Sequence, residues 1–130
     1  MTPAQARKLY DDSASEYDHC VALVDWMNLA KLTFHHNQNE TSTTAAGRDS
    51  IVRRIMRQKR MGVKKGVVDY YVFDRAPRKP EARGTAIEMK NSKGVTSDEQ
   101  KKWMKDLRAL GWEVGEFHSA EDAVRFLGEV

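Results

Sequence analysis

The sequence predicts an α/β domain in which one sheet packs against helices. Segments with helical periodicity alternate with short runs of β-branched and aromatic residues, in the order helix, strand, helix, strand, strand, helix, strand, helix. The chain has 130 residues, which is enough for one sizeable hydrophobic core but not for two. We therefore expect a single domain over residues 1–130.

The first predicted helix lies within residues 13–32, SASEYDHCVALVDWMNLAKL. Its inward stripe is predicted from apolar residues spaced by three and four positions, namely Tyr17, Cys20, Val21, Val24 and Met27. Ser13 and Glu16 have the spacing of a capping box, which would begin this helix. A short strand is expected at residues 32–36, followed by a polar loop to Gly47.

The second predicted helix, residues 48–62, is strongly basic. Its apolar stripe is expected to face inward and consists of Ile51, Val52, Ile55 and Met56. The outer side carries Arg53, Arg57, Arg60 and Lys64. From Arg48 to Lys65 there are eight basic residues and one acidic residue, a net charge of +7 within a chain of net charge +3. Such a local excess predicts a polyanionic partner, most often a nucleic acid.

The second half of the chain predicts an antiparallel pair of strands followed by a helix, a strand and a helix. The paired strands are VVDYYVFD (67–74) and TAIEMK (85–90), joined by a connection that contains two prolines. The third helix is expected from Ser97 to Leu110, with an inward stripe of Trp103, Met104, Leu107 and Leu110. A strand at 112–118 and a helix capped by Ser119 complete the prediction.

The composition excludes several classes of protein. Charged residues make up 32% of the chain and the mean hydropathy is −0.70, as expected for a soluble protein. No apolar run approaches the roughly 20 residues that cross a bilayer, and no signal peptide is visible, so we expect a cytoplasmic location without membrane contact. Cys20 is the single cysteine, which excludes a disulfide framework and a multi-cysteine zinc site.

Three charged residues occupy the facing ends of the predicted strand pair. Asp69 lies near the start of one strand, and Glu88 and Lys90 lie near the end of the other. Two adjacent carboxylates repel each other unless a divalent cation lies between them, and Mg²⁺ and Mn²⁺ prefer oxygen ligands. A lysine beside them can stabilise charge that develops on a phosphate. The set predicts metal-dependent hydrolysis of a phosphodiester.

The Glu-x-Lys pair has a second interpretation as a solvent-facing ion pair, which would contribute only about 0 to 1 kcal/mol to stability. The position of Asp69 on the neighbouring strand and the basic helix nearby favour the catalytic interpretation.

The chain also resembles the virus-type replication-repair nuclease (VRR-NUC) domain, a branch of the PD-(D/E)xK nuclease superfamily. The resemblance covers about residues 16–127, and the matching motif residues are Gly66, Asp69, Glu88, Lys90, Ser97, Gln100, Trp103 and Gly111. It implies a restriction-endonuclease-like core, with a central mixed sheet flanked by helices.

The resemblance also implies a role for each of these positions. Asp69 and Glu88 would be metal-binding carboxylates, Lys90 the catalytic lysine and Gln100 a catalytic residue of the helix that supports the site. Glu16 would be a further metal ligand, although Glu16 and Gln100 also have the spacing of helix caps. The residues expected to approach nucleic acid are Asn37, Arg53, Arg57, Arg60, Lys64 and Lys65.

Stand-alone, phage-encoded members of this family imply an activity for the chain. The expectation is a Mg²⁺- or Mn²⁺-dependent DNA endonuclease that acts as a homodimer on branched DNA such as Holliday junctions, in a bacterial or phage-infected cell. Two alternatives stay open: a nuclease for flaps, nicks or linear ends, and a DNA-binding module without catalytic activity.

Overall fold

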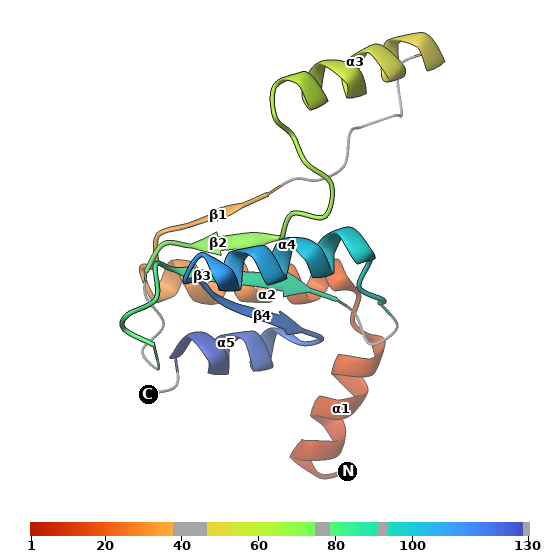
Figure 1. Cartoon of the computed structure of the whole chain (residues 1–130). Coiled ribbons are helices and arrows are strands. Elements are labelled where there is room, and N and C mark those ends of the chain that lie inside the picture. Colours follow the sequence, from red (N-terminus) through yellow and green to blue (C-terminus); the bar gives the residue numbers. More distant parts are fainter. Residues whose placement is uncertain (38–46, 75–78, 91–93, 129–130) are drawn as a thin grey trace.

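The computed structural model describes residues 1–37, 47–74, 79–90 and 94–128, and it has one four-stranded sheet with helices on both faces (Figure 1). The elements are α1 (Pro3–Ser13), α2 (Glu16–Leu29), β1 (Phe34–His36), α3 (Arg48–Arg60), β2 (Tyr70–Val72), β3 (Thr85–Met89), α4 (Asp98–Ala109), β4 (Glu113–Phe117) and α5 (Ala120–Gly128). None of the helices in these described ranges combines the length and apolar character that crossing a bilayer requires.

The sheet is mixed, as the sequence predicts. Its strands lie in the order β1-β2-β3-β4, with antiparallel pairing of β1 to β2 and of β2 to β3, and parallel pairing of β3 to β4. Parallel neighbours require a crossover connection, and α4 lies within it. The predicted α/β fold class and the antiparallel strand pair are confirmed.

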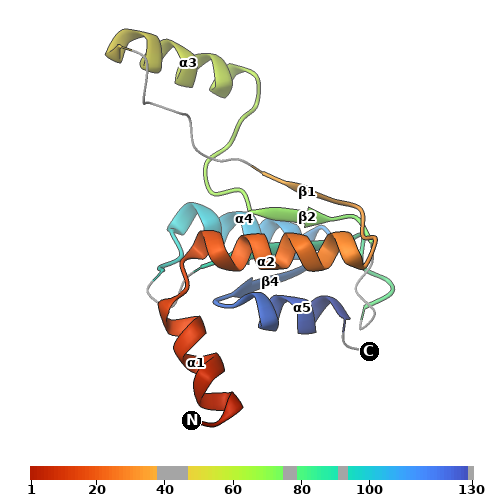
Figure 2. The same ribbon diagram turned by 180° about the vertical axis from the view of Figure 1, so that it is seen from behind.

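Strand β3 separates two hydrophobic clusters because successive side chains point to opposite faces of the sheet. Ile87 and Met89 pack with α2 and α5. Ala86 packs with Met104 and Leu107 of α4 on the other face. Figures 1 and 2 show α4 on one side of the sheet and α2 with α5 on the other. Glu88 follows Ala86 on the α4 face and is only 1% exposed.

The N-terminal part differs from the prediction. Helix α1 lies outside the predicted elements, although Thr2 and Gln5 cap its start by reciprocal hydrogen bonds. Helix α2 begins at Glu16 with a capping box between Ser15 and Asp18, so the predicted capping box from Ser13 is wrong. Ser13 and Glu16 have the same spacing as Ser15 and Asp18, so the spacing alone does not show which pair caps the helix.

The buried face of α2 is also shifted from the predicted stripe. His19, Leu23 and Met27 are buried, whereas Tyr17 is 75% exposed and Val21 is 41% exposed. His19 faces the core because its Nδ1 accepts a hydrogen bond from the backbone N–H of Ala120, at 3.1 Å, where α5 begins. A polar residue on the buried face makes that face harder to find by apolar periodicity.

Helix α3 forms where predicted, but its apolar stripe is not buried. Val52, Ile55 and Met56 are exposed and Ile51 is half-buried. Figures 1 and 2 both show α3 standing away from the sheet. Leu110 is also exposed rather than inward, because α4 ends at this residue. The periodicity located α3 and α4 but did not show which of their apolar residues are covered.

Candidate active site

The two central carboxylates lie opposite each other on β2 and β3. Tyr70 pairs with Ile87, so Asp69, just before β2, comes beside Glu88. The backbone N–H of Asp69 donates to Glu88 Oε2 at 3.2 Å, and the N–H of Met89 donates to Asp69 Oδ2 at 2.8 Å. Each carboxylate is therefore held by the backbone of the neighbouring segment.

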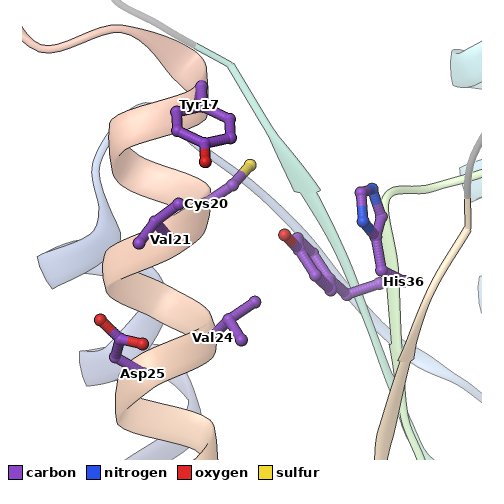
Figure 3. A pocket seen from close by; sticks show the side chains of 7 residues that line it. Tyr17, Cys20, Val21, Val24, Asp25 and His36 are labelled. Carbon is purple, nitrogen blue, oxygen red and sulfur yellow. The ribbon is translucent and has the colours of Figure 1, made fainter.

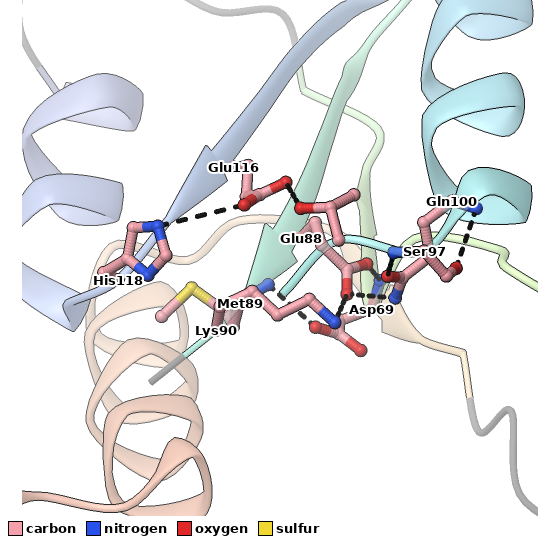
Figure 4. Close-up of polar contacts among 9 residues, drawn as sticks. Asp69, Glu88, Met89, Lys90, Ser97, Gln100, Glu116 and His118 are labelled. Carbon is pink, nitrogen blue, oxygen red and sulfur yellow. Dashed lines mark hydrogen bonds and ion pairs between the residues drawn. The ribbon is translucent and has the colours of Figure 1, made fainter. Parts of the chain in front are cut away.

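Two further side chains converge on Glu88 (Figure 4). The Lys90 ammonium lies 3.4 Å from Glu88 Oε1, and the Gln100 amide donates to the same oxygen at 2.7 Å. Lys90 is 13% exposed and so can be reached from solvent, whereas Glu88 is 1% exposed. The structure thus brings together Asp69, Glu88, Lys90 and Gln100 as the sequence predicts.

The Gln100 side chain both caps α4 and contacts Glu88. Its Oε1 accepts from the N–H of Ser97 at 3.0 Å, and its backbone N–H donates to Ser97 Oγ at 3.2 Å, which is a capping box. The amide nitrogen of the same side chain holds Glu88. The capping box at the start of α4 therefore fixes the orientation of the Gln100 amide that donates to Glu88.

Burial disfavours the ionised form of both carboxylates. Burial, together with the negative charge of Asp69, raises the pKa of the Glu88 carboxyl to about 8, although Lys90 opposes the shift. Burial likewise raises the pKa of Asp69, against the N–H of Met89 that lowers it. A bound divalent cation would favour the ionised form of both groups.

Asp69 and Glu88 suit an oxygen-preferring ion such as Mg²⁺ or Mn²⁺. Mg²⁺ is commonly held by one or two carboxylates, with waters and substrate phosphates completing its coordination. Within the described part of the chain, no three His, Cys, Asp or Glu side chains gather at metal-binding spacing. Asp69 and Glu88 are therefore the two carboxylates that would hold such an ion.

Glu16 lies in the first turn of α2, near but not within that pair. Its negative charge and that of Asp69 both act on Cys20 and on Tyr70, which are joined by a hydrogen bond. Burial is the main cause that raises the pKa of the Cys20 thiol to about 11. Glu16 thus shares the electrostatic surroundings of the site without joining a three-residue cluster.

Asn37 lies beside Asp69, but its side chain is engaged with the protein. Its backbone N–H donates to the Asp69 carbonyl at 2.7 Å, and its amide donates to the Val68 carbonyl at 3.0 Å. His36 next to it stacks on Tyr70 with ring centroids 4.7 Å apart. Asn37 therefore connects β1 to the segment that carries Asp69.

The predicted DNA-binding residues form an exposed series that leads toward the site. It runs along α3 and the following segment through Arg53, Arg57, Arg60, Lys64 and Lys65. Gly66 then passes against α4 with φ +76°, and a Cβ there would lie 2.7 Å from the backbone nitrogen of Gln100. The segment between the basic residues and Asp69 is thus packed against the start of α4.

Glu116 on β4 is a neighbour that sequence reasoning missed. It is paired in parallel register with Glu88, so both side chains lie on the α4 face. The Thr96 hydroxyl donates to Glu116 Oε2, and His118 Nε2 lies 3.8 Å from Glu116 Oε1 (Figure 4). Glu116 therefore anchors the residue that precedes the cap of α4.

Three comparisons place these features among known proteins. The family model described as "VRR-NUC domain" matches residues 1–121. A solved structure named "VRR_NUC domain protein" superposes with a TM-score of 0.66 at 18% sequence identity, over 86% of this chain and 84% of that one. No curated protein sequence matches the chain significantly.

Proposed function

The chain belongs to the VRR-NUC domain family, and from this premise we propose that it is a Mg²⁺- or Mn²⁺-dependent DNA endonuclease that cleaves branched DNA as a homodimer. The family implies a nuclease-type function. The observation that carries the proposal is the pairing of Asp69 and Glu88, with Lys90 and Gln100 both on one Glu88 oxygen.

Asp69 and Glu88 would hold the metal ion, and the charge of Glu16 in the first turn of α2 acts on the same neighbouring side chains as that of Asp69. A bound Mg²⁺ or Mn²⁺ polarises a phosphoryl oxygen and lowers the pKa of a bound water. The two hydrogen bonds between the strands keep both carboxylates oriented before substrate arrives. Preorganisation of this kind avoids a reorganisation cost during the reaction.

Lys90 and Gln100 contact the same Glu88 oxygen and would have different roles. The Lys90 ammonium, 3.4 Å from Glu88 Oε1, would stabilise negative charge on a phosphate bound at the metal ion. Gln100 is a positioning group that holds one Glu88 oxygen through its amide. Removing such an outer contact typically lowers metal affinity or activity by about 10–100-fold.

Branched DNA and a homodimer are supported by charge and by symmetry. The exposed arginines of α3 would bind phosphates, which reads the shape of DNA more than its sequence. A four-way junction presents two equivalent strands, and a two-fold symmetric dimer would present one active site to each. The rival enzyme activity is cleavage of flaps, nicks or linear ends, because one fold serves many substrates.

The first test is cleavage of a labelled four-way junction beside flap, nicked and linear duplexes, with Mg²⁺, Mn²⁺ or EDTA. We expect paired symmetric cuts that disappear in EDTA. In Glu88→Gln and Lys90→Ala the rate should fall by roughly 100-fold or more. Lys102→Ala is the matched control, because Lys102 is 78% exposed on α4 and pairs only with Asp106 among the ion pairs described.

The alternatives give different results in the same experiment. Preferential cleavage of flaps or ends would keep the metal-dependent chemistry and reject the junction as substrate. Junction binding without cleavage under any metal, with equal affinity in Glu88→Gln, would identify a DNA-binding module.

A further inference from the structure

The apolar stripe of α3, defined as Ile51, Val52, Ile55 and Met56, is not tightly packed against any other element that the structure describes. Val52 is 45% exposed, Ile55 37% and Met56 61%. Within the described residues, α3 is in none of the closely packed pairs of elements. An isolated helix of about 13 residues is only marginally stable in water, so its apolar face needs a packing partner.

A groove on α2 offers an apolar surface that can receive such a stripe. Tyr17, Val21 and Val24 line it from one side of α2, opposite His36 and Tyr70, and it encloses about 230 Å³ (Figure 3). Three and four residues separate the α2 members, so they form one continuous helix face. Tyr17 and Val21 expose much of their apolar surface there.

The helices that carry the two surfaces differ in charge, because α3 is strongly basic and α2 is acidic. The side of α3 away from its stripe carries Arg53, Arg57 and Arg60, and Lys59 lies at the C-terminal end of the stripe. Helix α2 carries Glu16, Asp18 and the groove-lining Asp25 but no lysine or arginine. Pairing α3 with a second α3 would instead bring two strongly basic helices together, which costs free energy through like-charge repulsion.

We propose that two copies of the chain exchange their α3 helices, so that the apolar stripe of each packs into the α2 groove of the other. The contact occurs twice around a two-fold axis and buries both surfaces at once. It leaves the arginines of α3 facing outward.

This inference rests on the homodimer of the proposed function, and its test measures mass independently of cleavage. Size-exclusion chromatography with light scattering should give twice the chain mass of 14.9 kDa for the wild type. Ile55→Glu in the stripe and Val21→Glu in the groove should each give monomers with unchanged circular dichroism. Leu110→Glu is the control, because Leu110 is 63% exposed but lies at the end of α4 on the other face of the sheet.

Mixing the two monomeric variants distinguishes exchange from other dimers. A mixed pair has one contact in which both the stripe and the groove are wild type, so equimolar Ile55→Glu and Val21→Glu should recover dimers that neither forms alone. Raising the salt concentration should weaken the wild-type dimer, because opposite charges are screened.

Several outcomes would overturn the exchange. These are a monomeric wild type, a Val21→Glu variant that stays dimeric, and a mixture that stays monomeric. A monomer that cleaves junctions would reject this interface and keep the nuclease. A dimer that obeys the mixing test but cuts no DNA would keep the interface and reject the nuclease.

Discussion

Glu88 combines the electrostatic cost of a buried carboxylate with a proposed role in metal binding. It lies on a fully buried strand and contacts a backbone N–H, an ammonium and an amide. An ionised carboxylate in such a position is destabilising unless a cation compensates it. Stability and metal binding should therefore be coupled at this residue.

We predict that the metal-free protein loses stability as the pH rises from about 5 to 8. The folded-state pKa of Glu88 is about 8, above the ordinary value of 4.5, so folded protein binds the proton more tightly than unfolded protein. The stabilisation is complete below pH 4.5 and disappears as the pH rises through 8. Thermal unfolding in EDTA should show a fall of a few kcal/mol, which Glu88→Gln should largely remove.

Added Mg²⁺ supplies the control for this prediction. It should raise the melting temperature most at alkaline pH, where both carboxylates are ionised, and should have little effect on Glu88→Gln. A wild-type melting temperature that is flat across this pH range in EDTA would contradict the coupling.

Sequence reasoning can find a site residue when its position depends only on the pairing of two strands that are neighbours in the chain. Asp69, Glu88 and Lys90 follow from two strands joined by one connection. Glu116 could not be found in this way, because its position beside Glu88 depends on the parallel pairing of β3 with β4 across α4. The sequence GEFH gives no local sign of that neighbour.

Gly66 lies where the segment before β2 passes the first turn of α4, and the site contains residues from both. Its φ of +76° is unfavourable for other residues, and a Cβ would lie 2.6 Å from the Glu99 backbone carbon in the first turn of α4. The backbone of α4 cannot move aside for a Cβ as easily as a flexible side chain could. A larger residue must therefore move the start of α4, and Gln100 with it.

We predict that Gly66→Ala lowers cleavage by about 10–100-fold through displaced Gln100, and destabilises the fold by about 1–3 kcal/mol. Gly62→Ala is the matched control, because Gly62 also has positive φ, +97°, but open space around its Cβ position. That control should lose stability through backbone strain while its cleavage rate stays close to wild type. Chemical denaturation and single-turnover cleavage measure the two effects, and equal cleavage rates for both variants would contradict the coupling.

Helix identity was easier to predict than helix packing. Periodicity located α2, α3, α4 and α5, but it assigned Tyr17 and Val21 of α2 to the core and the α3 stripe to the interior. An apolar stripe indicates that a face is covered without showing which molecule covers it. His19 is the opposite case, a polar side chain that lies on a buried helix face and accepts a hydrogen bond from the backbone of Ala120.

At the scale of the whole molecule, fold class and charge distribution were both predictable. The mixed sheet follows from one hairpin and one crossover. The net charge of +7 between Arg48 and Lys65 is a property of the sequence alone. What could not be predicted is that α3 projects from the sheet, because the arrangement of a helix depends on contacts distant in the chain.

We predict that the outer face of α3 accounts for much of the salt dependence of DNA binding. Replacing Arg53, Arg57 and Arg60 by alanine should reduce the slope of log K against log salt by about 0.9 for each phosphate that the variant no longer neutralises. Fluorescence anisotropy with a junction in EDTA measures this without cleavage. A triple alanine variant of Lys101, Lys102 and Lys105 on α4 is the charge-matched control, and an unchanged slope for the α3 variant would contradict the assignment.

The separation of charge also affects how the protein meets DNA before the two molecules touch. One segment carries +7 and the remaining chain carries −4, so the molecule has a large electric dipole moment. In the field of a polyanion such a body rotates as it diffuses, and the α3 end turns toward the DNA. Fewer collisions then occur in unproductive orientations, which raises the association rate most at low ionic strength.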